Sequence, residues 1–108
     1  MASEVVIDAS ANLKGDGGEI VVWSDIENSQ SVTMVSGSLH ARGGPNGGDG
    51  GKIETSGFHL DVEGIDIALI ANKPFKNGYW LLDPYDYTLS SGDVRAIESA
   101  LSLSLIHI

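Results

Sequence analysis

Carboxylates and a serine are the residues in this chain that could carry catalysis. Three carboxylates, Asp61, Glu63 and Asp66, share one polar stretch, and a polysaccharide-cleaving enzyme needs such an acid and base on one cleft. No lysine or arginine is placed to hold a substrate carboxylate beside them, and 15 acidic residues in a chain of 108 form such groups by chance. Ser24 precedes Asp25 without a histidine in the same repeat, so a hydrolase triad is not supported. We predict no catalytic residues and no enzyme activity.

Histidines and glycine-rich segments could hold a metal ion or a phosphate, but their spacing is unsuitable. His40 and His59 have no second histidine or cysteine at ligand spacing. Segment 47–51 resembles the start of a glycine-rich calcium repeat, but a lysine follows where that repeat has an aspartate. No phosphate-loop ending follows the glycines. We predict no metal and no cofactor, and we expect Asp16 and Asp49 to accept hydrogen bonds from backbone amides within their own turns.

Composition limits the partners of the chain. Its net charge of −9 argues against nucleic acid, because phosphate binding needs clustered lysine and arginine. No apolar run approaches the ~20 residues of a membrane span, so we expect no stable membrane insertion. The first residues lack the basic and apolar regions of a secretory signal.

A glycine turn that leads into a strand occurs three times. Residues 15–22 (GDGGEIVV) return as 48–55 (GDGGKIET), and a weaker copy begins at Gly78. Units at 7–24, 39–56 and 67–83 each predict strand, turn and strand. This repetition favours a parallel β-solenoid of stacked units over a β-sandwich with hairpin turns. The glycines to which we assign the turns are Gly15, Gly17, Gly18, Gly48, Gly50, Gly51 and Gly78, and for the turn at 15–18 we expect positive φ.

Alternation within the strands predicts the residues that face the interior. On the inner side we place Ile20, Val22, Leu39, Ala41, Ile53 and Thr55. A further short strand is expected over 85–89. After Gly92 the pattern changes: Asp93 can cap a short helix with Val94, Ile97 and Leu101 on one side.

Aromatic residues are the candidates for surface binding. Trp23, Tyr79 and Trp80 could stack on sugars or pack against a partner, as could Tyr85 and Tyr87. Aromatics in stacked β-structures more often lie in the interior.

Four segments resemble large bacterial exoproteins of the filamentous-haemagglutinin type, which are exported by two-partner secretion. They are 17–25 (GGEIVVWSD), 41–57 (ARGGPNGGDGGKIETSG), 81–89 (LLDPYDYTL) and 93–101 (DVRAIESAL), in the family's order. The chain departs from the family at Tyr79 and Trp80, where smaller aliphatic residues are common, and at Leu89, where isoleucine is more usual.

This resemblance implies a right-handed parallel β-helix without catalysis, with coils over 1–89 and a linker and short helix over 90–102. It implies an internal fragment, downstream of the secretion domain, of a secreted or surface-displayed adhesin of a Gram-negative bacterium. An outer-membrane transporter would export the parent protein, which would bind a host-cell or glycan receptor. The alternative is a carbohydrate-binding or carbohydrate-cleaving β-helix module.

The last residues, 103–108 (LSLIHI), do not continue the repeat. They resemble the translation of a sequencing-library adapter, CTG TCT CTT ATA CAC ATC. We interpret them as a non-native tail; the alternative is a genuine terminal strand.

Overall fold

A computed structural model describes residues 1–85, 90–101 and 105–107. The chain forms short strands and one helix: β1 (Val6–Asp8), β2 (Glu19–Trp23), β3 (Val32–Met34), β4 (Ser38–His40), β5 (Lys52–Gly57), β6 (His59–Asp61), β7 (Asp66–Ala68), β8 (Tyr79–Pro84), α1 (Ser91–Leu101) and β9 (Leu105–His107). Every pairing between these strands is parallel. The expected class, all-β with a short helix, is confirmed.

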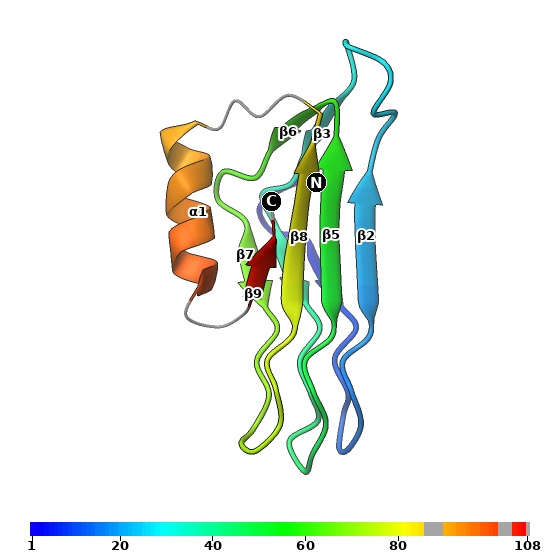
Figure 1. Ribbon diagram of the computed structural model, residues 1–108, viewed down its shortest axis with the longest axis vertical. Coiled ribbons are helices and arrows are strands. Elements are labelled where there is room, and N and C mark those ends of the chain that lie inside the picture. The colour runs from blue at the N-terminus through cyan, green and yellow to red at the C-terminus, as the bar shows by residue number, and fades with distance from the viewer. Residues whose placement is uncertain (86–89, 102–104, 108) are drawn as a thin grey trace.

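Strands that neighbour one another come from successive units of the sequence. The sheets have the orders β1-β4-β7, β2-β5-β8-β9 and β3-β6, and Figure 1 shows β2, β5 and β8 side by side. Ile7 lies opposite Leu39, which lies opposite Ile67. Equivalent positions of the units are therefore paired, as parallel in-register ladders require.

One hydrophobic core fills the space between the sheets. It draws on all three, with Leu39 from β4, Ile53 from β5 and Leu60 from β6. The inward predictions for Ile20, Leu39, Ala41, Ile53 and Thr55 are confirmed by their burial, and Val22 is half-buried.

One prediction for the aromatic residues is wrong. Trp80 was a candidate for surface binding, but its side chain is fully buried. Its ring nitrogen Nε1 donates a hydrogen bond to the Thr55 hydroxyl at 3.0 Å. Successive residues of a strand face opposite sides, so Tyr79 and Trp80 cannot both face outward. Trp80 pairs with the buried Ile53 and shares its inward direction.

The turn glycines follow two different constraints. Gly15 has the expected positive φ of 128°, and Gly48 of the next unit has 125°. The expectation is wrong for Gly17 and Gly18, and the other three turn glycines, Gly50, Gly51 and Gly78, also lack positive φ. These are glycine because another segment of backbone or a small side chain lies against them: a Cβ on Gly51 would overlap the carbonyl oxygen of Gly18.

Aspartates join successive units at the same corner. The amide of Asp49 donates to Asp16 Oδ1 at 2.8 Å, and the amide of Lys76 donates to Asp49 Oδ1 at 2.9 Å. The expectation that each aspartate bonds within its own turn is wrong. Parallel stacking places the equivalent amide of the next unit within reach of each carboxylate.

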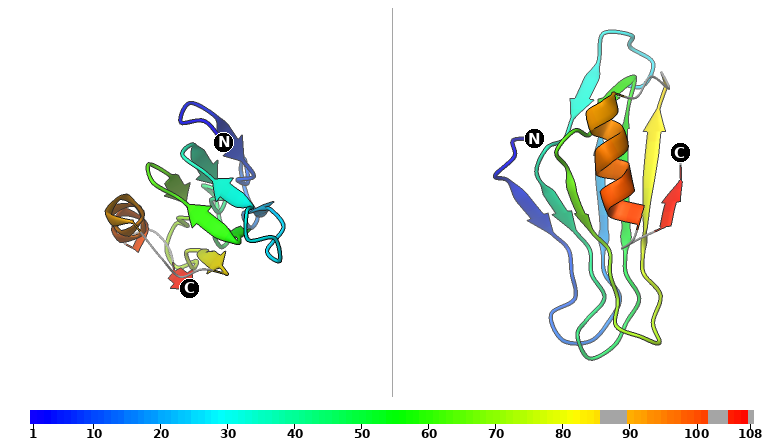
Figure 2. Two further views of the ribbon diagram at one scale, coloured as in Figure 1. Left: turned by 90° about the horizontal axis from the view of Figure 1, so that it is seen from above. Right: turned by 90° about the vertical axis from the view of Figure 1, so that its left-hand side faces the viewer.

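Helix α1 packs on one end of the sheets, against β7 and β9 (Figure 2). Ser90 and Asp93 form a reciprocal cap, Asp93 N to Ser90 Oγ at 3.1 Å and Ser90 N to Asp93 Oδ2 at 2.9 Å. The other oxygen of Asp93 accepts from the Val62 amide at 2.7 Å. The predicted apolar side is shifted, because Val94 is 43% exposed while Ala96 and Ala100 are buried.

The predicted tail contributes strand β9. Its residues 105–107 pair with Tyr79, Trp80 and Leu81 of β8. Strand pairing depends on backbone groups and says nothing about the origin of the segment. Residues 86–89, most of the further strand expected over 85–89, lie outside the described part of the chain.

Candidate functional site

The carboxylates considered for catalysis are engaged in separate interactions. Asp61 Oδ1 accepts from the amide of Glu63 at 3.0 Å. Asp66 Oδ2 lies 3.2 Å from His40 Nε2. Ser24 bonds the hydroxyl of Thr33 at 2.7 Å. Asp61 is thus bonded within its own loop, Asp66 to a histidine of β4 and Ser24 to a threonine of β3.

The histidines bond separate partners. His40 is mostly covered beside Asp66, and His59 Nε2 lies 2.9 Å from the carbonyl oxygen of Ser29. Among residues 1–85, 90–101 and 105–107, no three His, Cys, Asp or Glu side chains are grouped to hold a metal ion.

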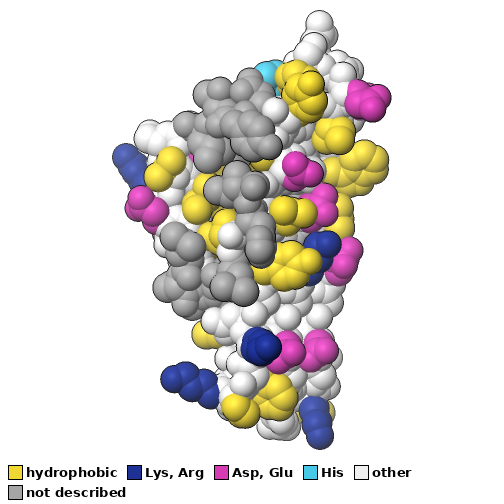
Figure 3. All heavy atoms as spheres, in the orientation of Figure 1, with side chains coloured by type: hydrophobic (Ala, Val, Ile, Leu, Met, Phe, Trp, Pro, Cys, Tyr) yellow, Lys and Arg dark blue, Asp and Glu magenta, His cyan; other side chains and the backbone are white. Residues whose placement is uncertain are grey.

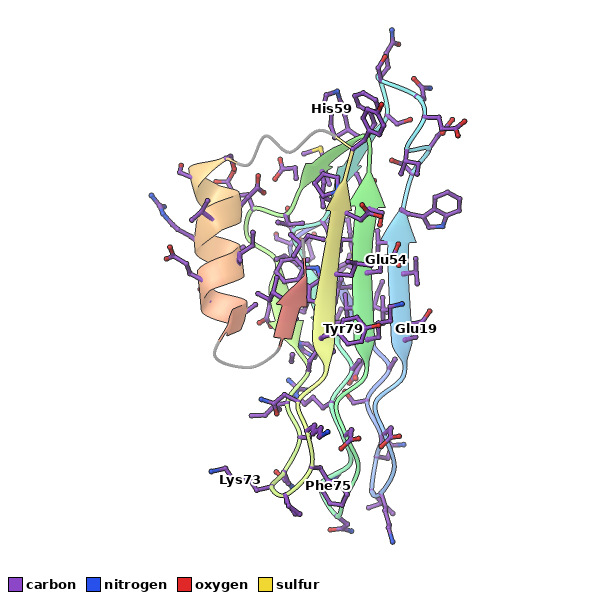
Figure 4. The ribbon with its side chains drawn as sticks, viewed as in Figure 1. Glu19, Glu54, His59, Lys73, Phe75 and Tyr79 are labelled. Carbon is purple, nitrogen blue, oxygen red and sulfur yellow. The ribbon has the colours of Figure 1, made fainter. Side chains whose placement is uncertain are left out.

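A row of polar and aromatic side chains crosses the outer face of the second sheet. Glu19 of β2, Lys52 of β5 and Tyr79 of β8 stand in register. Figure 4 shows Glu19 of β2 and Tyr79 of β8 at one level, with Glu54 farther along β5, the strand between them. Alternation directs all of them away from the core.

Lys52 and Tyr79 interact directly. The Lys52 ammonium Nζ lies 5.7 Å from the centre of the Tyr79 ring, within the range of a cation–π contact. A hydrogen bond with Tyr79 raises the pKa of Lys52, and the charges of Tyr79, Glu19 and Glu54 act in the same direction. Lys52 is therefore positively charged at neutral pH and held toward the tyrosine.

A shallow hollow of about 540 Å³ lies where the three glycine turns enter β2, β5 and β8. We call it the corner trough. Its lining comprises Asp16, Gly17, Gly18, Glu19, Asp49, Gly50, Gly51, Lys52, Lys76, Asn77, Gly78 and Tyr79. Figure 3 shows the corresponding band of uncoloured atoms across this face, with charged side chains on both sides of it. Backbone forms the floor because five of the lining residues are glycines, which carry no side chain. They are Gly17, Gly18, Gly50, Gly51 and Gly78.

Two rims border the corner trough, each contributed by all three units. The rim on the strands is the row Glu19, Lys52 and Tyr79, and the rim on the turns is the row Asp16, Asp49 and Lys76. The hollow therefore carries three carboxylates, two ammonium groups and one aromatic ring. It can offer hydrogen-bond acceptors, donors and an apolar contact to one ligand.

The aromatic candidates within the described residues lie in four different environments. Tyr79 is half-buried and lines the corner trough. Trp23 is 67% exposed at the far end of β2 and does not line the trough. Trp80 is in the core. Tyr85 stacks on Phe58, with ring centroids 4.7 Å apart, and Tyr87 lies outside the described residues.

Sequence reasoning assigned no role to the two lysines and Glu19. The sequence does contain a pattern that could have indicated this row. Aligning the three glycine turns puts Glu19, Lys52 and Tyr79 at equivalent positions. Those positions become a site only when the units are paired side by side.

No helix in the described part of the chain is long and apolar enough to span a membrane. Comparison with known proteins finds no matching family model, no matching curated protein and no matching solved structure. The resemblance to filamentous-haemagglutinin-like exoproteins therefore stays a prediction from the sequence motifs.

Proposed function

We propose that this chain is a segment of a right-handed parallel β-helix and that it serves as a structural rod in a secreted or surface-displayed bacterial adhesin. The observation that carries the proposal is the in-register parallel pairing of equivalent strands from three successive units. The ordered motifs at 17–25, 41–57 and 81–89 support the exoprotein family. Right-handedness follows from the strong preference of crossovers between parallel strands.

The dimensions indicate how such a rod would lengthen. The molecule measures 44 × 24 × 22 Å, and its longest axis runs along the strands of the second sheet (Figure 1). Each added unit would extend the stack by about 4.8 Å, perpendicular to the strands. A long projection therefore needs many such units, which fits a segment of a larger adhesin.

The proposed parent protein would reach the cell surface through an outer-membrane transporter and bind a host-cell or glycan receptor. Absence of cysteine from the chain suits export in an extended form, because no disulfide would form before passage. The locus provides a test. We expect an upstream secretion domain and a neighbouring transporter gene; an intact reading frame with neither would contradict the adhesin assignment.

Deletion of one unit tests the β-helix. Ser38 pairs with Asp66, so removing residues 38–65 puts Asp66 where Ser38 stood. We expect this variant to keep strand-rich circular dichroism and cooperative unfolding. Removing residues 38–51, which is half a unit, should abolish both. A folded half-unit variant, or an unfolded full-unit variant, would contradict the stacking.

The alternative of a carbohydrate-cleaving module has its own test. Release of reducing sugar from a panel of polysaccharides should stay at the level of the buffer. Turnover that disappears in Asp61→Asn or Glu63→Gln would replace the rod proposal with an enzyme.

A further inference from the structure

We propose that the corner trough binds a neutral oligosaccharide that lies along the stacking direction, across all three units. This binding role goes beyond the structural rod and does not depend on the adhesin assignment. The proposal uses the volume of the trough, the groups on its rims, their charge and the hydrogen bonding of its floor.

The trough has the size and length of a site for an extended ligand. Its volume of about 540 Å³ falls within the range of ~300–1,000 Å³ typical of small-molecule sites. It extends over all three units, because its floor is glycine backbone from each of them. A rigid, extended ligand fits this shape better than a compact one.

The rims carry the groups that a sugar requires. Sugar hydroxyls both donate and accept hydrogen bonds, and the rims present carboxylates such as Glu19 beside the ammonium groups of Lys52 and Lys76. The Tyr79 ring supplies an apolar contact for the C–H groups of a pyranose. Tyrosine combines such a surface with a polar hydroxyl.

The charges on the rims select against acidic glycans. Asp16, Glu19 and Asp49 outnumber Lys52 and Lys76 in the trough lining, and the whole chain carries −9. A uronic acid or a sulfated sugar would meet net repulsion there. A neutral sugar would not.

The floor argues against a peptide as the ligand. An extended peptide binds an exposed strand through free backbone groups. Here the floor amides donate within the fold: Gly17 to the Asp49 carbonyl at 2.9 Å, Gly51 to Ala41 at 2.8 Å and Gly78 to Leu69 at 2.8 Å. Recognition must therefore come from the rim side chains.

Titration of the full chain with three neutral trisaccharides tests the proposal, using trimers of glucose, mannose and N-acetylglucosamine. Backbone amide shifts in nuclear magnetic resonance report where each sugar binds, and a heparin-derived oligosaccharide serves as the acidic comparison. We expect at least one neutral trimer to shift Gly17, Gly51 and Gly78, and we expect the acidic sugar to bind more weakly.

Variants separate the trough from the rest of the surface. Tyr79→Ala should weaken binding about tenfold, the size of a lost aromatic contact. Lys76→Ala, on the exposed rim, should weaken it about threefold without affecting the fold. Trp23→Ala, outside the trough, should bind like the parent chain. Circular dichroism confirms that each variant is folded.

Three results would overturn the proposal. One is no shift with any neutral trimer at millimolar concentration. The second is preferential binding of heparin or of an extended peptide. The third is binding that Trp23→Ala removes and that Lys76→Ala leaves unchanged. None of them would affect the unit-deletion test of the β-helix, so the two proposals can fail separately.

Discussion

The glycine corner and the interior stack obey different rules. At the corner, glycine recurs in each unit, at Gly18, Gly51 and Gly78. In the interior, the paired positions are Ile20, Ile53 and Trp80, two isoleucines and a much larger tryptophan. Backbone of the preceding unit leaves no space for a Cβ on Gly51 or Gly78, and Ala9 lies against Gly18. The interior only has to be filled, and neighbouring side chains can adjust to a larger one.

The difference explains why the repeat is visible in the glycines and obscured in the strands. A position restricted by a neighbouring backbone accepts one residue type in every unit. A position restricted by total volume accepts several, provided that the core remains packed. Substitutions at the two regions should therefore differ in whether they can be compensated.

The largest effect is expected at the corner. Gly51→Ala would drive a Cβ into the carbonyl oxygen of Gly18, and backbone there cannot move without separating two units. We expect a loss of about 4 kcal/mol in the free energy of unfolding, or no folded protein. Urea unfolding measures it. Gly64→Asn is the control: Gly64 has positive φ, which asparagine tolerates, and a Cβ there would meet Ser36 only at 4.0 Å, so this change should cost about 1 kcal/mol or less.

The interior should respond nearly as strongly to a single truncation. Trp80→Ala removes a fully buried ring and the partner of the Thr55 hydroxyl. We expect the free energy of unfolding to fall by about 3 kcal/mol, measured by urea unfolding.

Compensation distinguishes the interior from the corner. The exchange Ile53→Trp with Trp80→Ile conserves volume within one stack. The double variant should lose less unfolding free energy than the two single variants lose in sum. A cost equal to that sum would show that the interior is as rigid as the corner and would remove the distinction.

The aspartates provide a smaller test of the corner. Asp49→Ala removes the acceptor for the Lys76 amide at a half-buried position. We expect a loss of about 1 kcal/mol. Asp49→Asn keeps an oxygen acceptor and should retain most of the stability. Equal losses of stability for the two variants would mean that the charge of Asp49, and not its hydrogen bond to the next unit, stabilises the fold.

The smallest effect concerns the rim. Tyr79→Phe should lower the pKa of Lys52 toward its ordinary value, because the hydrogen bond with Tyr79 is the main cause of the raised pKa. Any stability from this pair is present at neutral pH and is lost as the pH rises through the pKa of Lys52. Nuclear magnetic resonance titration of the lysine side chain measures the shift. Glu19→Gln should lower the pKa less, and the reverse order would contradict the assigned cause.

The sequence supported predictions wherever local chemistry determines the outcome. The glycine turns and the burial of Leu39 and Ile53 follow from residue type and alternation. Asp93 takes part in the cap of α1 as predicted, but the residue before the helix is Ser90 and Asp93 lies in the first turn. The carboxylate bonds of Asp16 and Asp49, and the contact of Asp93 with Val62, depend on which segment lies alongside. Alternation alone also leaves open which face of a strand is inside, which is how Trp80 was assigned to the surface.

The trough was missed for the same reason. Its rims combine residues from three units, and Glu19, Lys52 and Tyr79 lie far apart in the chain. The motifs at 17–25 and 41–57 describe single units. Only the register between units assembles the two rims.

Disulfide trapping tests the in-register parallel stack most directly, because the chain contains no cysteine. Val21 pairs with Glu54 across β2 and β5, at a spacing that a disulfide can bridge. The double variant Val21→Cys with Glu54→Cys should form an intramolecular disulfide under mild oxidation. Val21→Cys with Lys52→Cys, displaced by two residues, should not. Efficient trapping of the displaced pair with failure of the in-register pair would contradict the stack.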